Sequence, residues 1–163
     1  MAHDNKIITK SAEETQRCGE KLADSLMQER NNAGRVPSIV CLYGELGSGK
    51  TTFAQGFAKG LGIPSRLLSP TFIIVRRYSL IDKNTFFYHI DLYRMKSVSD
   101  TDGLGLQEIF SDPHAIILIE WAQRLGALLP KTRTDIHFSV LSDDERRIEV
   151  RSENSEDSED QKI

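Results

Sequence analysis

Apolar residues gather along the chain in short runs, each about the length of a strand. Residues 38–43 and 115–119 are almost continuously apolar, which is typical of strands that are buried on both faces of a parallel sheet. Residues 72–78 and 85–90 are β-rich and flank a polar turn at 81–84, so they predict an antiparallel hairpin.

Two segments nearer the chain ends extend this pattern. Residues 6–9 predict a short edge strand. Residues 135–140 and 147–150 alternate polar and apolar positions around a turn at 142–144, which predicts a closing hairpin.

Helical spacing fills the segments between these strands. A capping box of the S-x-x-E form starts at Ser11, and the pattern continues to about Gln28, with a polar turn expected over 29–37. Residues 52–61 carry three large apolar side chains at helical spacing before the stop signal at Gly62. Shorter helices are expected at 104–110 and 123–129, with a polar loop over 97–105.

The strongest chemical signal lies between the first buried strand and the helix that follows it. Residues 44–51 have the G-x-x-x-x-G-K-T pattern of a phosphate-binding P-loop, in the strand–loop–helix context that this pattern requires. Its glycines let backbone N–H groups turn inward around an anion, with the positive helix end behind them. Lys50, which we expect to be exposed, can reach the β- and γ-phosphates, and the Thr51 hydroxyl can ligate Mg²⁺.

The alternative is a glycine-rich turn that matches this pattern by chance, and the flanking strand and helix make that much rarer. We therefore predict a nucleotide site. The candidate residues in and after the loop are Gly44, Glu45, Leu46, Gly47, Ser48, Gly49, Lys50, Thr51 and Thr52. The adenine needs a surface near the far end of the phosphate cradle, and the segment 10–15, which includes Ser11, is a candidate for it. An ordinary helix cap is the alternative for this segment.

Two carboxylates stand where predicted strands end. Asp91 follows the strand at 85–90, and open α/β sheets place ligand chemistry at this edge, although a turn or cap residue would look the same. Glu120 leaves the strand at 115–119 in a Walker-B-like arrangement, which would hold Mg²⁺ directly or through water. Aspartate is the commoner residue at that position. Trp121, the single tryptophan, is either a core anchor or part of the site.

Composition narrows the class of protein. The 163 residues fit one domain, which we place at 1–151, followed by an acidic tail at 152–163 that we expect to be disordered. A net charge of −3 gives no general reason to bind nucleic acid. Cys18 and Cys41 are expected to be buried free thiols, because no metal-ligand spacing is present. With no signal peptide and no membrane span in the sequence, we expect a cytoplasmic protein.

Six motifs occur here in one order, and together they resemble a known family. They are residues 44–51, Ser69-Pro70-Thr71-Phe72, Tyr88-His89-Ile90-Asp91-Leu92-Tyr93-Arg94, residues 105–110, Ile119-Glu120-Trp121 and Leu129-Pro130. In this order the chain resembles the bacterial TsaE family, formerly called YjeE, which are small P-loop ATPases of tRNA threonylcarbamoyladenosine synthesis. The resemblance runs from about Ser11 to Val150, and it makes glutamate the expected residue at position 120.

The resemblance implies an α/β fold, a P-loop NTPase-like three-layer sandwich whose sheet mixes parallel and antiparallel strands. It implies a protein that binds ATP or ADP with Mg²⁺ and hydrolyses ATP slowly when alone. Its partners would be TsaD and TsaB, with tRNA reached indirectly through that complex and no membrane involved. ATP hydrolysis would serve turnover of the assembly that modifies the adenosine next to the anticodon.

By matching motifs, the resemblance also assigns roles to residues. Lys50 and Thr51 would hold phosphate and Mg²⁺, and Glu120 would be a second Mg²⁺ ligand. Thr71 would sit in a switch-like loop near the γ-phosphate. Asp91 would orient water or Mg²⁺. Trp121 would line the site or a partner surface.

Two other classes of P-loop protein remain as alternatives. A small-molecule kinase shares the loop, the size and the sheet, but it needs an acceptor pocket and usually an arginine-bearing lid. Arg76 and Arg77 lie in a predicted strand and not in a helical lid, which counts against a kinase. A GTP-binding switch would need an N-K-x-D-type motif, and none is present.

Overall fold

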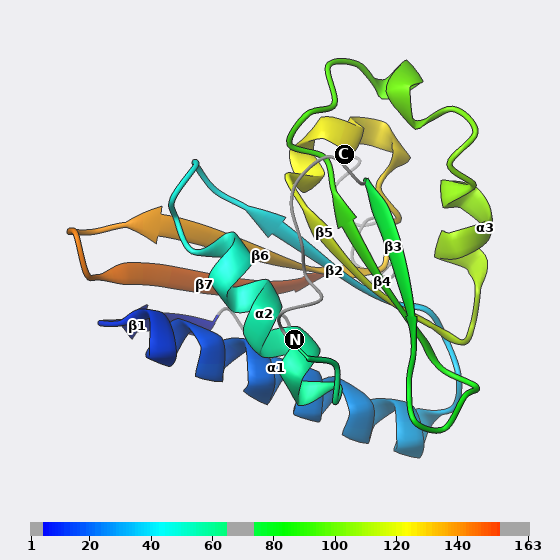
Figure 1. Cartoon of the computed structure of the whole chain (residues 1–163), viewed down its shortest axis with the longest axis horizontal. Coiled ribbons are helices and arrows are strands. Elements are labelled where there is room, and N and C mark those ends of the chain that lie inside the picture. Colours follow the sequence, from blue (N-terminus) through cyan, green and yellow to red (C-terminus); the bar gives the residue numbers. More distant parts are fainter. Residues whose placement is uncertain (1–4, 65–73, 154–163) are drawn as a thin grey trace, which may run out of the picture.

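The computed structural model describes residues 5–64 and 74–153. Within these residues a seven-stranded sheet has the strand order β1-β7-β6-β2-β5-β4-β3 (Figure 1). The strands are β1 (Asn5–Thr9), β2 (Ser38–Tyr43), β3 (Val75–Ser79), β4 (Phe86–Asp91), β5 (Ala115–Glu120), β6 (Arg133–Val140) and β7 (Arg146–Glu153). Strands β6, β2, β5 and β4 are parallel, whereas β7 and β1 at one edge and β3 at the other pair antiparallel. The predicted mixed sheet and both predicted hairpins are confirmed.

Helices connect the parallel strands and cover the two faces of the sheet. They are α1 (Ala12–Ala33), α2 (Lys50–Gly60) and α3 (Leu106–Ser111), together with the 3₁₀ helices η2 (Val98–Thr101) and η3 (Ala122–Leu128). Among the described residues, no helix combines the length and apolar character that crossing a membrane requires.

Helix α1 extends to Ala33 and is longer than the sequence predicts, so the expected polar turn over 29–37 is confirmed only for residues 34–37. The last helical turns carry exposed polar side chains, except that Arg30 is buried at 9% exposure. The Arg30 guanidinium donates hydrogen bonds to the carbonyl oxygens of Val36, Pro113 and Ala115 and to Ser38 Oγ. This arginine joins the end of α1 to the segments that lead into β2 and β5. These hydrogen bonds explain why the polar end of α1 is helical and packed against the sheet.

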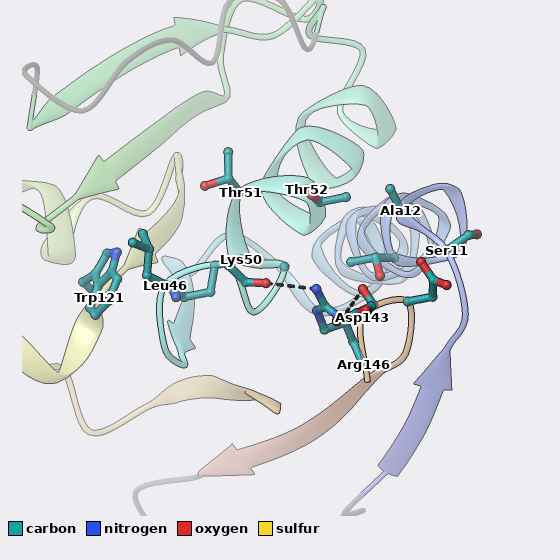
Figure 2. A pocket seen from close by; sticks show the side chains of 13 residues that line it. Ser11, Ala12, Leu46, Lys50, Thr51, Thr52, Trp121, Asp143 and Arg146 are labelled. Carbon is teal, nitrogen blue, oxygen red and sulfur yellow. Dashed lines mark hydrogen bonds between the residues drawn. The ribbon is translucent and has the colours of Figure 1, made fainter. Parts of the chain in front are cut away.

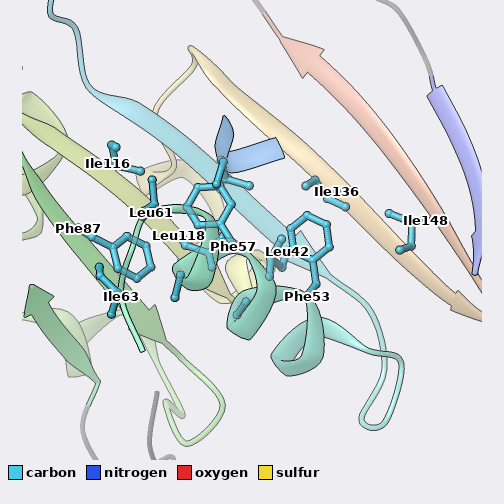
Figure 3. Packing of buried hydrophobic residues seen from close by; sticks show 14 of the residues in the cluster. Leu42, Phe53, Phe57, Leu61, Ile63, Phe87, Ile116, Leu118, Ile136 and Ile148 are labelled. Atoms are coloured by element: carbon cyan, nitrogen blue, oxygen red, sulfur yellow. The ribbon is translucent and has the colours of Figure 1, made fainter. Parts of the chain in front are cut away.

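Two hydrophobic clusters, one on each face of the sheet, confirm the three-layer arrangement. The first lies under α1 and α2 and includes Phe53, Phe57, Phe87, Leu118 and Ile136 (Figure 3). The second lies on the opposite face, under α3 and η3. Strand β5 contributes alternate residues to both clusters and is buried along its whole length, as predicted for a parallel strand.

Helices α1 and α2 meet backbone to backbone at two glycines. A Cβ built on Gly19 would lie 2.2 Å from the Phe53 carbonyl oxygen, and one on Gly56 would lie 1.9 Å from the Gln16 carbonyl oxygen. No other residue fits at such distances. This contact fixes the start of α1 beside the start of α2, where the P-loop ends.

The two cysteines are free thiols in different surroundings. Cys41 in β2 is buried, as expected, but Cys18 in α1 is only half-buried. Strand β7 extends to Glu153, two residues past the predicted end of the domain. The rest of the tail, 154–163, lies outside the described residues, and its disorder stays a prediction.

Candidate functional site

The P-loop joins the end of β2 to the start of α2, in the predicted context. Gly47 and Gly49 have φ angles of 79° and 107°, in a region that side chains with a Cβ rarely adopt. Gly49 is also the N-cap of α2, so the helix begins at Lys50 with its N–H groups facing the loop. The glycines at these positions are therefore required by the backbone path, and the positive end of α2 lies behind the loop.

Lys50 is buried, at 4% exposure, so the expectation of an exposed side chain is wrong. Its ammonium donates hydrogen bonds to the carbonyl oxygens of Gly44 at 2.6 Å and Glu45 at 2.7 Å and to Ser48 Oγ at 3.2 Å. The Trp121 ring covers it, with its centroid 4.2 Å from Nζ. Burial lowers the pKa of Lys50, and the charges of Glu120, Asp91 and Glu45 oppose that shift. The carbonyl oxygens of the P-loop therefore bind the Lys50 ammonium, which the sequence predicts to bind phosphate.

Glu120 meets the loop through Thr51. The Thr51 hydroxyl donates a hydrogen bond to Glu120 Oε1 at 2.9 Å. The other carboxylate oxygen, Oε2, lies 2.7 Å from Nε2 of His89 on β4, and His89 and Glu120 are 5% and 2% exposed. The structure thus brings together two residues that the sequence proposes as metal ligands, and it adds a histidine to which sequence reasoning gave no role.

Asp91 lies beside Glu120 because of the strand register. Strands β4 and β5 are parallel, and Asp91 and Glu120 are paired at their C-terminal ends. Burial raises the pKa of Asp91, and the neighbouring Glu120 charge raises it further. The Asp91 carboxylate accepts a hydrogen bond from the Tyr93 N–H at 3.0 Å. The edge of the sheet therefore concentrates negative charge next to Lys50 and Thr51, where a cation would be favoured.

A cavity of about 340 Å³ opens along the loop. Figure 2 shows Trp121 on one side of the loop and Ser11 on the other. The predicted residues that line the cavity are Ser11, Leu46, Gly47, Gly49, Lys50, Thr51, Thr52 and Trp121. The predicted surface at the start of α1 therefore does border the same cavity as the P-loop.

Other predicted residues lie next to this cavity without lining it. Gly44, Glu45 and Ser48 hold the Lys50 ammonium from behind. Asp91 and Glu120 lie next to the cavity, behind Lys50 and Thr51. Thr71 lies outside the described residues, so its predicted place near the γ-phosphate stays a prediction.

Trp121 has an unusual backbone. Its φ and ψ are 60° and 41°, a left-handed conformation that a bulky residue rarely adopts. Its half-buried ring also packs against the second hydrophobic cluster and contacts Tyr93, with ring centroids 5.2 Å apart. The side chain is therefore both a core neighbour and a wall of the cavity, so the two readings of this residue are not exclusive.

The turn between β6 and β7 contributes residues that sequence reasoning missed. Asp143, Asp144 and Arg146 line the cavity. Figure 2 shows Asp143 and Arg146 on the same side as Ser11. The Arg146 guanidinium donates to the Gly47 carbonyl oxygen at 3.2 Å and to the carbonyl oxygens of Ser142, Asp143 and Glu145. The sequence predicts this turn, but the parallel pairing of β6 with β2 is what places it at the P-loop.

The donor set suits Mg²⁺. Thr51 Oγ1 and Glu120 Oε1 are hard oxygen donors that lie 2.9 Å apart, with the Asp91 carboxylate alongside. No group of three or more His, Cys, Asp or Glu side chains within the described ranges is placed to hold a metal ion. Mg²⁺ commonly takes one or two carboxylates and completes its ligands with phosphates and water, so these residues fit an ion that arrives with a nucleotide.

Comparisons with known proteins show what this chain is similar to. Residues 9–148 match the family model described as "Threonylcarbamoyl adenosine biosynthesis protein TsaE". The tRNA threonylcarbamoyladenosine biosynthesis protein TsaE of Treponema pallidum is 34% identical over 145 residues, which cover 89% of this chain and 98% of that protein. The Bacillus subtilis protein of the same name is 43% identical over 110 residues, covering 68% of this chain and 66% of that protein.

A solved structure matches as well. The crystal structure of YdiB from Bacillus subtilis superposes with a TM-score of 0.71 at 33% sequence identity, over 96% of this chain and 90% of that chain. The family model covers most of the chain, and the Treponema pallidum relative aligns over nearly its full length. The chain therefore belongs to the TsaE family.

Proposed function

We propose that this protein binds ATP with Mg²⁺ and hydrolyses it slowly, as a subunit of the machinery that makes threonylcarbamoyladenosine in tRNA. The observation that carries the proposal is the meeting of Lys50, Thr51 and Glu120 at the P-loop, with Thr51 Oγ1 and Glu120 Oε1 2.9 Å apart. The placement in tRNA modification is supported by the names of the relatives, which are tRNA threonylcarbamoyladenosine biosynthesis proteins.

In this proposal each residue has a distinct task. The Lys50 ammonium moves from the carbonyl oxygens of Gly44 and Glu45 to the β- and γ-phosphates, which offer it stronger acceptors. Thr51 and Glu120 hold Mg²⁺, which neutralises charge on the phosphates. Asp91, beside Glu120, orients the attacking water or the ion. The adenosine half extends along the cavity toward Ser11.

The site contains an arginine, but it lies on the side of the cavity opposite Trp121 (Figure 2). Arg146 donates to backbone carbonyl oxygens in the P-loop and in its own turn, so we assign it to the wall of the cavity and not to the charge of the transition state. An arginine supplied in trans accelerates related P-loop enzymes by about 10³–10⁵. We therefore propose that hydrolysis is slow alone and becomes faster when a partner completes the site.

The proposed partners are TsaD and TsaB, and tRNA is reached through their complex. ATP hydrolysis would support turnover of that assembly. ATP would favour docking because the triphosphate can order the loop that contains Thr71.

Steady-state ATPase assays with and without purified TsaB and TsaD test the proposal. We expect the protein alone to turn over well below ~1 s⁻¹ and the partners to accelerate it. Pull-downs in ATP, ADP and no nucleotide should show ATP favouring the complex. Lys50→Ala is the control, and it should lose most nucleotide binding. A fast isolated enzyme that ignores its partners, with equal pull-down in all three conditions, would contradict the proposal.

Nothing in the described part of the chain favours the small-molecule kinase. Arg76 and Arg77 lie in the edge strand β3, and the Arg77 guanidinium lies 4.9 Å from the centroid of the Phe86 ring. Neither arginine belongs to a helical lid. An ADP-release assay with a panel of small phosphate acceptors separates the two functions, because only a kinase would respond to an acceptor.

A further inference from the structure

Glu120 is held from two sides by residues of different elements. Thr51, the second residue of α2, donates to Oε1 at 2.9 Å, and His89 Nε2 on β4 lies 2.7 Å from Oε2. Because a carboxylate can only accept, the histidine donates this hydrogen bond. Each carboxylate oxygen therefore has its own donor, and the orientation of the group is fixed.

The position of His89 follows from the strand register. His89 precedes Asp91 by two residues on β4, so both side chains point to the same face as Glu120, the face under α2. His89 pairs with Leu118 and thus lies one row deeper in the sheet than the two carboxylates. Its ring stacks on Phe87, with centroids 6.4 Å apart and an interplanar angle of 22°. The imidazole therefore packs on Phe87 within the core and does not line the cavity.

We propose that His89 is a positioning residue for the Mg²⁺ site, a role that rests on the nucleotide function proposed above. By binding Oε2, the imidazole turns Oε1 toward Thr51, where the ion of a bound nucleotide would lie. Glu120 is 2% exposed, so water cannot readily replace the lost donor. Hydrogen-bond partners of metal ligands typically change metal affinity or activity by about 10–100-fold when they are removed.

The alternative is a buried histidine that only satisfies a buried carboxylate. Both roles predict a change in stability when His89 is replaced, so stability alone does not separate them. The dependence of nucleotide binding on Mg²⁺ separates the two roles. If His89 is merely structural, its replacement leaves the affinity for the ion unchanged in a folded variant.

The experiment compares His89→Asn with His89→Gln. Both amides are polar, but only the glutamine side chain is long enough to place a donor where Nε2 lies. Fluorescent ADP is titrated into each folded variant, first with EDTA and then across a Mg²⁺ series. We expect His89→Asn to raise the Mg²⁺ concentration needed for half-maximal effect by about 10–100-fold, and His89→Gln to stay close to wild type. The affinity for nucleotide in EDTA should be the same in all three proteins.

A double-mutant cycle identifies the route of the effect. If His89 acts through Glu120, His89→Asn should cost nothing further in a Glu120→Gln background. If His89→Asn does not fold, His89→Leu fills the buried site without a donor and should show the same weakened response to Mg²⁺. Unchanged Mg²⁺ dependence in the folded variants, or an equal loss in the Glu120→Gln background, would overturn the inference. A wild-type protein that binds no nucleotide would instead refute the proposed function.

Discussion

Replacing Gly56 by alanine tests whether the contact between α1 and α2 holds the site together. The new methyl carbon would lie 1.9 Å from the Gln16 carbonyl oxygen, and ordinary contact begins at 3.4 Å, so the helices must separate by about 1.5 Å. Overpacking typically costs about 1–3 kcal/mol, and a clash with helix backbone belongs at the upper end of that range. Alanine is favoured over glycine within a helix by about 1 kcal/mol. The expected net loss is therefore about 2 kcal/mol, or roughly 4–8 °C in Tm for a chain of this size.

Thermal melts by circular dichroism measure the stability of this variant, and fluorescent-ADP titration measures the site. Nucleotide affinity should also fall, because Ser11, the N-cap of α1, and Thr15 within α1 line the cavity that also borders the start of α2. Ser25→Ala, at an exposed position of α1, controls for helix propensity and should change stability by no more than about 0.5 kcal/mol. Propensity alone predicts that Gly56→Ala is stabilising. A variant that melts at or above the wild-type temperature would therefore refute the packing argument.

Two further predictions concern single side chains of the site. Trp121 is the only tryptophan, and its ring lies 4.2 Å from Lys50 Nζ, so intrinsic fluorescence should shift when ATP and Mg²⁺ draw the ammonium away. Emission spectra check this, Lys50→Ala should abolish the shift, and an unresponsive wild-type spectrum would contradict it. Asp91→Asn should raise the free energy of unfolding at pH 7. The raised pKa of Asp91 means that the folded state disfavours the charged carboxylate, so wild type loses stability as pH rises through that pKa, whereas the neutral asparagine does not. Urea unfolding at pH 7 and pH 5 checks the sign: the gain should shrink at the lower pH, and a gain that grows there would contradict the assignment.

The sequence predicts which segments form strands and helices better than it predicts which of these elements lie next to one another. The continuous apolar runs of β2 and β5 identify buried parallel strands, because only such strands are buried on both faces. The extension of α1 to Ala33 was not predicted, because it depends on four hydrogen bonds of Arg30, two of which reach the distant residues Pro113 and Ala115. Such long-range bonds leave no periodic trace in a sequence.

The candidate site divides in the same way. The P-loop and Glu120 are predictable because a local motif specifies the loop and a strand end specifies the carboxylate. His89 had a usable signal, since it precedes Asp91 by two residues and must share its face. Arg146 had none, because its place beside Gly47 depends on the pairing of β6 with β2, and a hairpin pattern does not encode which strand the hairpin joins.

The backbone contact between α1 and α2 also makes the two helices one mechanical element. Where side chains separate two helices, changes of rotamer can absorb a small shift, but Gly19 and Gly56 leave no side chain to do so. We therefore expect a displacement of α2 to be carried to the start of α1. From there, the 2.7 Å hydrogen bond between the Thr15 and Thr9 hydroxyls carries it to β1 at the edge of the sheet. We therefore expect the edge strand β1 to shift together with the P-loop, although about 40 residues of sequence separate the two.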